Sequence, residues 1–239
     1  MKYRSVLFTA FLVVAFAAVS ASAAPLLNMM VMTDAPGDTP VNWAPSGTDN
    51  GDGSFTYGGS LVDPDGHWTL EWECTAKADP FLSASYTLVN TDVNTLTYTL
   101  LSTLPIAPAV TPASLMGGSV GGSVTDANFN GVGGAATAPG MPLYAGLMDG
   151  VSVLPIYPDP NAWNVTFQGE TVNIPSVNAG LPGPVIPGPA VINDIGIQNQ
   201  FTLTPGDRVA LTAFFVVTPE PSSCVLMMLG VAALVGRRR

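Results

Sequence analysis

Apolar and polar residues alternate through most of the chain between Pro25 and Thr218, with the period of a β-strand that buries one face. The alternation is strictest in HWTLEWEC, residues 67–74. One side of this segment is apolar: Trp68, Leu70, Trp72 and Cys74. The other side is polar: His67, Thr69, Glu71 and Glu73. We therefore expect a strand that turns its apolar side into a core.

Seven further segments show the same period and predict strands: ASYTLVN (84–90), NTLTYTLLS (94–102), GSVGGSVTD (118–126), AWNVTFQ (162–168), ETVNI (170–174), NQFTLT (199–204) and RVALTAFFVV (208–217). The first two flank TDV (91–93), and this short separation predicts a β-hairpin. No apolar stretch longer than ten residues between Pro25 and Thr218 has the period of a helix.

The segments between the predicted strands are rich in turn-forming residues: APGDTP, DNGDG, DPDGH, PDPN and TPGD. Short strands joined by such turns predict an all-β fold, an antiparallel β-sandwich of jelly-roll or immunoglobulin-like type. The segment AGLPGPVIPGPA (179–190) predicts a long surface loop, or a crossing at a sheet edge, because proline cannot donate to a sheet ladder. The length suits a single domain, which we place at residues 24–218.

The first 23 residues have the three parts of a secretory signal peptide. Lys2 and Arg4 form a positive start, residues 6–19 form an apolar run, and Ala21-Ser22-Ala23 provides small residues for cleavage. We expect the mature chain to begin at Ala24, with cleavage between Ala24 and Pro25 as the alternative. A permanent N-terminal anchor is the weaker interpretation, because small residues follow the apolar run at once.

Charge is distributed very unevenly along the chain. Residues 24–218 hold sixteen acidic side chains and only two basic ones, Lys77 and Arg208, for a formal charge of −14. Nucleic-acid phosphates are bound by clustered lysine and arginine, so nucleic acids and acidic substrates are poor partners, and we expect no nucleic acid to bind. The acidity suits a cation as partner, serves solubility, or is an adaptation to salty surroundings.

The C-terminal segment combines an apolar run with a positive end. Residues 222–236 carry no charge, and Arg237, Arg238 and Arg239 follow them. A helix of this length spans about 22 Å, which is short of the roughly 30 Å hydrocarbon layer. Arginine clusters stay on the cytoplasmic side, and their long stems extend the effective span. We therefore expect a short transmembrane helix that holds the domain outside the inner membrane.

The order of Pro219-Glu220-Pro221, the apolar run and Arg237-Arg238-Arg239 resembles the PEP-CTERM sorting signal of bacterial exported proteins. The resemblance covers about the last 20 residues, and it is the whole arrangement, together with the signal peptide, that is specific. It implies that an exosortase-type membrane transpeptidase cuts near 219–221. It also implies a secreted or cell-surface protein in a bacterium that makes extracellular polysaccharide.

The segment TDANFNG (125–131) resembles the first half of a calcium-binding loop. Asp126, Asn128 and Asn130 alternate before Gly131, and such oxygens wrap a hard cation well. The twelfth position carries Thr137 in place of the expected glutamate, so an asparagine-rich turn between strands is the competing interpretation. TDNGDGS (48–54) is a poorer match to the same pattern, because threonine occupies its first position.

Four tryptophans raise the possibility of carbohydrate binding, because flat rings stack on sugar faces. Trp68 and Trp72 share the apolar side of their strand, which predicts core positions. Trp43 and Trp163 lie near turns and are the better candidates for exposure. A carbohydrate-binding module that uses Trp43 or Trp163 is therefore an alternative function.

The sequence favours a protein without enzyme activity. His67 is the only histidine, so it would have to serve any Ser-His-Asp or Cys-His site, and its polar side of the strand predicts a solvated residue. Cys74, on the apolar side, predicts an inert core thiol. Glu71 and Glu73 could form a glycosidase pair, but nothing in the pattern separates their pKa values. A secreted polysaccharide hydrolase is accordingly the weakest alternative.

We therefore expect an exported structural or adhesive protein of the cell surface or the extracellular matrix, associated with extracellular polysaccharide. Its functional residues are those of sorting: Pro219, Glu220, Pro221, Arg237, Arg238 and Arg239.

Overall fold

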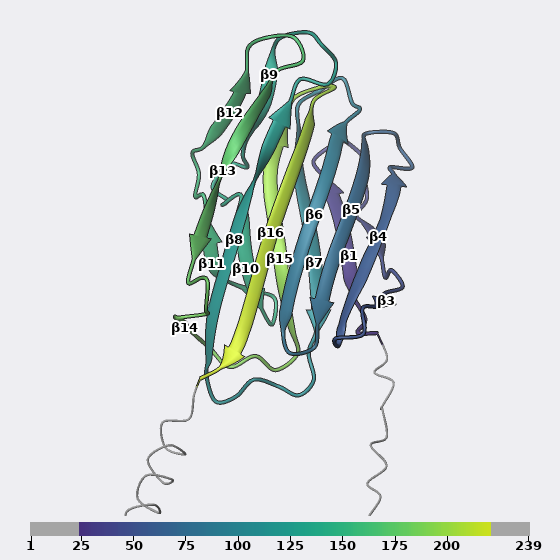
Figure 1. The fold of residues 1–239 in the computed structure, drawn as a ribbon. Helices are drawn as coiled ribbons and strands as arrows, with labels where there is room; N and C mark the ends of the chain where they lie inside the picture. Colours follow the sequence, from purple (N-terminus) through teal and green to yellow (C-terminus); the bar gives the residue numbers. More distant parts are fainter. Residues whose placement is uncertain (1–23, 221–239) are drawn as a thin grey trace, which may run out of the picture.

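The computed structural model describes residues 24–220 as a sandwich of two eight-stranded antiparallel sheets (Figure 1). Sheet A contains β1 (Asn28–Thr33), β2 (Val41–Trp43), β7 (Leu96–Pro105), β9 (Gly133–Thr137), β10 (Tyr144–Met148), β11 (Val151–Ile156), β12 (Ala162–Val165) and β15 (Asp194–Leu203). Sheet B contains β3 (Thr48–Asp49), β4 (Ser54–Val62), β5 (Trp68–Lys77), β6 (Phe81–Asn90), β8 (Ser114–Thr125), β13 (Thr171–Ala179), β14 (Ile186–Gly188) and β16 (Arg208–Pro219). The all-β sandwich predicted from the sequence is confirmed.

Sheet order brings strands that are distant in the sequence side by side. Sheet A runs β11-β10-β15-β7-β1-β2, with β9 paired to both β15 and β12. Sheet B runs β13-β8-β16-β6-β5-β4-β3, with β14 paired to β8. The last strand, β16, therefore lies in the middle of sheet B, hydrogen-bonded to β6 on one side and to β8 on the other.

The core lies between the sheets and follows the alternation read from the sequence. On β5 the buried positions are the predicted ones: Trp68, Leu70, Trp72 and Cys74. Glu71 and Glu73 are exposed on the outer face of the same strand. Aromatic rings fill the space between the sheets, and Tyr98 stacks on Phe201 with ring centroids 5.7 Å apart.

Buried polar groups connect the two sheets through the core. The hydroxyls of Tyr86 on β6 and Ser102 on β7 are hydrogen-bonded at 2.7 Å. The Tyr144 hydroxyl donates to the Phe214 carbonyl at 2.9 Å, which joins β10 to β16. A buried polar group that lacks a partner is costly, so these bonds fix how the sheets sit on one another.

The predicted hairpin between residues 84–90 and 94–102 is wrong. β6 pairs with β5 and β16 in sheet B, whereas β7 pairs with β1 and β15 in sheet A. The connection at 91–95 therefore crosses from one sheet to the other. Alternation indicates that each strand has a buried face, but it does not distinguish a neighbour in the same sheet from a partner in the facing sheet.

The proline-rich segment 179–190 is largely a surface loop, as predicted. It also contains the three-residue β14, whose Ile186 lies opposite Met116 of β8. The second half of the segment therefore lies along an edge of sheet B, which corresponds to the alternative prediction of a crossing at a sheet edge. Several strands gave no clear signal in the sequence: β1, β2, β3, β4, β9, β10 and β11.

The sandwich has two distinct ends. The proximal end contains the start of β1, the 106–113 connection and Pro219, because Asn28 pairs with Thr103 and Pro219 pairs with Ser114. The distal end contains the connections 34–40, 63–67, 91–95, 126–132, 166–170 and 204–207. Figure 1 shows the proximal end at the bottom of the molecule. Within residues 24–220 no helix is long and apolar enough to cross a bilayer.

The predicted signal peptide at 1–23 and the predicted transmembrane helix at 222–236 lie outside the described residues. The same holds for Pro221 and for Arg237, Arg238 and Arg239.

Glycines on β8 allow sheet B to pack closely. A Cβ atom at Gly122 would lie 2.0 Å from the carbonyl oxygen of Ala210 on the neighbouring β16. That oxygen belongs to the backbone, so it cannot move away as the end of a flexible side chain could. The glycines of the GGSVGGSV segment (117–124) therefore have a packing role.

We expect Gly122→Ala to lower the free energy of unfolding by about 2 kcal/mol or more, because the added methyl group forces the β8 and β16 backbones apart. Gly183→Ala is the matched control, since nothing lies within 4 Å of its Cβ position. The control is expected to change stability by less than about 0.5 kcal/mol. Urea unfolding of both variants measures the difference, and equal stabilities would contradict this account of β8.

Candidate functional site

The predicted sorting residues begin inside the folded domain. Val217, Thr218 and Pro219 belong to β16 and lie opposite Met116, Leu115 and Ser114 of β8. The Val217 amide also donates to the Pro80 carbonyl at 3.0 Å. Val217 is fully buried, whereas Pro219 and Glu220 are exposed. The sorting motif is thus joined to the sandwich without a flexible linker.

A pocket of about 230 Å³ opens beside this exit at the proximal end. It is lined by the β5–β6 turn, the β7–β8 connection and the last residue of β16: Ala78, Asp79, Pro80, Ala107, Pro108, Ala109, Val110 and Pro219. Pro219, the last residue of β16, therefore borders this pocket at the point where the chain leaves the sandwich.

The predicted calcium residues lie together in the distal connection between β8 and β9. Asp126 is buried, and its carboxylate accepts the amides of Gly131 at 2.8 Å and Gly169 at 3.0 Å. The Asn128 and Asn130 side-chain oxygens accept amides within the same loop, from Asn130 and Val132. The side-chain oxygens of Asp126, Asn128 and Asn130 therefore lie in one loop, but each residue already accepts a hydrogen bond from a backbone amide.

Electrostatics around this loop favour a charged Asp126. Burial acts to raise the pKa of Asp126, but hydrogen bonds from the amides of Gly131, Gly169 and Asn130 outweigh it and lower the pKa. The neighbouring Asp207 is also buried, and burial raises its pKa despite hydrogen bonds from Thr204 and Gly134.

The twelfth position of the predicted calcium loop does not contribute to it. Thr137 lies in β9, and its hydroxyl donates to the Asp159 carboxylate at 2.7 Å. Among residues 24–220, no three histidine, cysteine, aspartate or glutamate side chains are placed to hold a metal ion. Calcium binding at Asp126, Asn128 and Asn130 therefore stays a prediction based on three loop oxygens.

The tryptophans differ from the sequence-based expectation in one respect. Trp163 is only 8% exposed, and it packs edge-on against Tyr157 with ring centroids 5.5 Å apart. The prediction that Trp163 is exposed is wrong, because β12 directs it into the core opposite Ala135. Trp43 is half-buried and lies against Trp72, with ring centroids 5.8 Å apart. Neither ring stands free on the surface.

The residues considered for enzyme chemistry are separated in the structure. Glu71 and Glu73 lie on the outer face of sheet B in a shallow depression with Ser60, Ser85 and Thr87. Cys74 is buried, and burial raises the pKa of its thiol to about 12. A thiol in this environment stays protonated and unreactive at neutral pH.

His67 is not simply solvated, as the sequence suggested. Its Nδ1 lies 2.6 Å from the Asp92 carboxylate, and its backbone amide donates to Asp63 at 2.8 Å. The hydrogen bond to Asp92 raises the pKa of His67. The pKa of Asp92 is lowered by the Asn94 backbone amide first and by His67 second. The pair ties the β4–β5 connection to the β6–β7 connection.

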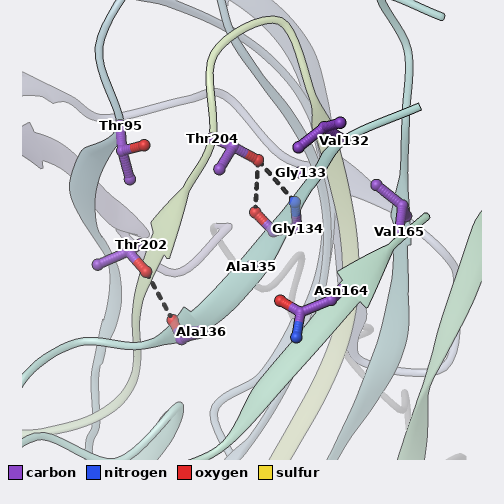
Figure 2. A pocket seen from close by; sticks show the side chains of 10 residues that line it. All are labelled: Thr95, Val132, Gly133, Gly134, Ala135, Ala136, Asn164, Val165, Thr202 and Thr204. Atoms are coloured by element: carbon purple, nitrogen blue, oxygen red, sulfur yellow. Dashed lines mark hydrogen bonds between the residues drawn. The ribbon is translucent and has the colours of Figure 1, made fainter. Parts of the chain in front are cut away.

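A groove of about 320 Å³ lies on the outer face of sheet A near the distal end (Figure 2). We call it the threonine groove; its lining residues are Thr95, Val132, Gly133, Gly134, Ala135, Ala136, Asn164, Val165, Thr202 and Thr204. Small residues of β9 form the floor between β12 and β15. The Thr204 hydroxyl accepts the Gly134 amide at 2.7 Å, and its oxygen lies 2.8 Å from the Gly134 carbonyl oxygen, which fixes one wall.

The sequence did not reveal this groove, because its residues come from four segments that only the fold brings together. Two exposed aromatic residues beside it were missed as well. Phe129 lies inside the polar run DANFNG, and Phe167 lies two residues before the glycine of TFQGE. The signal in the sequence that could have identified these two residues is an aromatic side chain inside a turn-forming segment.

We expect the His67–Asp92 pair to stabilise the fold in a limited pH range. A raised folded-state pKa of His67 gives stability that is complete below about pH 6.5 and is lost as the pH rises through that raised value. His67→Gln should therefore lower the melting temperature at about pH 5.5 and change it little at about pH 9. Asp65→Asn, an exposed acid in the same connection, is the control. An equal loss at both pH values would contradict the ion pair.

Calcium binding is tested by calorimetry on the full chain. We expect a heat signal at millimolar calcium, because sites with few carboxylates bind this ion weakly. Asn130→Ala removes one loop oxygen and should reduce the signal, whereas Asn173→Ala on β13 should not. The absence of heat at millimolar calcium would end the calcium prediction.

Comparison with known proteins identifies one segment of the chain. Residues 217–239 match the model of the PEP-CTERM protein-sorting motif, in agreement with the resemblance seen in the sequence. No curated protein matches the chain. The motif supports an exported precursor that passes a membrane and is processed by an exosortase-type membrane enzyme. This protein carries a PEP-CTERM protein-sorting motif, which begins in the last strand of its β-sandwich.

Proposed function

We propose that this protein is a non-catalytic component of the cell surface or extracellular matrix, where it associates with extracellular polysaccharide. The observation that carries the proposal is the direct connection of β16 to the sorting motif. The motif provides the route of export, and the sandwich is the part delivered by that route. The structural role belongs to residues 24–218, and the sorting role belongs to Pro219, Glu220, Pro221 and the three terminal arginines.

The geometry supports presentation of the distal end. β16 has twelve residues, so it separates the sorting motif from the distal connections by about 40 Å. A protein held at Pro219, in a membrane or after transfer to another carrier, keeps its distal connections away from the point of attachment.

The surface chemistry supports a hydrated, sugar-rich environment. Hydroxyl side chains are spread over the outer face of sheet B: Thr56, Ser60, Thr69, Thr75, Ser83, Ser85, Thr87, Ser119, Ser123, Thr125, Thr171 and Thr212. Such neutral groups exchange hydrogen bonds with water and with polysaccharide hydroxyls alike. The acidic net charge of the chain adds solubility.

The proposal is tested by expressing the chain in an exporting bacterium with and without an exosortase. We expect loss of mass at the C-terminus only when the enzyme is present, and recovery of the processed protein with the extracellular polysaccharide. Glu220→Ala combined with Pro221→Ala should block the mass change. This variant keeps Pro219 in its pairing with Ser114, so the fold is preserved.

Glu71→Ala is the matched control, because it removes an equally exposed glutamate from the outer face of sheet B. It should be processed at the rate of the unaltered chain. An unchanged C-terminal mass in the presence of the exosortase would contradict the sorting role. A processed protein that separates completely from the polysaccharide fraction would contradict the proposed destination.

A further inference from the structure

Three apolar side chains project from neighbouring connections at the distal end. Phe129 is 66% exposed, Val132 is 72% exposed and Phe167 is 71% exposed. We call these three residues the distal apolar tip. The Phe129 ring lies against Gly169, where a Cβ atom would be 2.8 Å from the ring, so the 126–132 and 166–170 connections touch. Adjacent exposed apolar groups of this size mark a binding surface more often than isolated ones do.

The backbone holds this tip in place. Phe129 has a φ of 58°, a left-handed conformation that is costly for an aromatic residue. The Asp126 carboxylate stabilises the loop by accepting the amides of Gly131 and Gly169. On the other connection, the Glu170 carboxylate accepts the Phe167 amide at 3.1 Å. Both rings are thus displayed by connections that are already ordered before any partner binds.

The tip continues into the threonine groove. Val132, which is labelled in Figure 2, belongs to both. Val165 also lines the groove, and it precedes Phe167 by two residues in the sequence. All ten residues that line the groove are uncharged, in a chain whose formal charge is −10. Within the part of the chain that the structure describes, the side chains of Thr95 and Asn164 form no hydrogen bonds, so both can bond to a partner.

We propose that the distal apolar tip and the threonine groove together bind a neutral polysaccharide. The inference rests on the proposed function and identifies the surface through which the polysaccharide is bound. The C–H face of a sugar ring packs on Phe129 and Phe167, and its hydroxyls reach Thr95, Thr202 and Asn164. Apolar walls with a few neutral polar groups are the usual composition of a site for an uncharged ligand.

The charge distribution favours this partner over two others. An anionic polysaccharide would be repelled by the acidic chain, and the groove offers it no lysine or arginine. A membrane surface would suit the three apolar side chains, but it would leave the hydroxyl and amide groups of the groove without a role. Bacterial membranes also carry anionic lipids, which bind basic rather than acidic proteins.

The test measures binding of the full chain, purified in detergent, to soluble dextran, galactomannan and xyloglucan, with alginate as the anionic comparison. We expect binding to at least one neutral polysaccharide and none to alginate. Phe129→Asn with Phe167→Ser should weaken binding by about tenfold or more, because both rings are lost. Asparagine tolerates the left-handed conformation at 129, so this variant is expected to fold.

Two further variants separate the surface from general effects. Asn164→Ala should also weaken binding, because it removes an amide from the groove. Ile192→Asn replaces a similarly exposed apolar residue at the proximal end and should bind as the unaltered chain does. Thermal unfolding of every variant confirms that loss of binding is not loss of fold.

Three results would overturn the inference: no binding to any of the neutral polysaccharides, equal binding to alginate, or unchanged binding by the double phenylalanine variant. Binding to phosphatidylcholine vesicles that the double variant loses, without binding to polysaccharide, would assign the tip to a membrane and would also overturn it. Processing by the exosortase is followed in parallel. A processed protein that is recovered with the extracellular polysaccharide but does not bind through this surface rejects this surface alone, whereas failed processing, or separation from the polysaccharide fraction, rejects the proposed function.

Discussion

The fold depends on the burial of one face of each sheet against the other. Alternating side chains supply the apolar layer, and hydrogen bonds such as Tyr86–Ser102 and Tyr144–Phe214 fix the relative position of the two sheets. Most core residues lie on the strands, although the connections contribute some, such as Val110, Leu143 and Val191. The groove, the acidic loops and the exposed aromatic residues all belong to those connections or to the adjoining outer faces.

Alternation in the sequence predicted the fold class and the inward face of β5, since the period of two is a direct consequence of strand geometry. It did not predict pairing. β6 and β7 follow each other closely, yet they lie in different sheets, because a short polar connection can either turn back or cross over. Strands rich in glycine or methionine, such as β9 and β1, were missed because their side chains give little contrast between the two faces.

The sorting motif could be recognised from the sequence because its residues are contiguous and its order is characteristic. The threonine groove could not, because Thr95, Gly134, Asn164 and Thr202 meet only through strand pairing. The exposure of Trp163 was predicted from its nearness to a turn. In the structure Trp163 occupies an inward-facing position of β12, so its side chain is buried. The inward or outward direction of a residue in the strand's alternation therefore predicts its exposure better than its nearness to a turn does.

The central position of β16 has a consequence for the order of events during export. Secretion delivers the N-terminal strands first, but sheet B has a gap between β6 and β8 until residues 208–219 arrive. The strand that fills this gap also carries the first residues of the sorting motif. Sheet B of an exported chain can therefore be completed only once the start of the sorting motif has also arrived, so closure of the domain depends on the same residues that begin the motif.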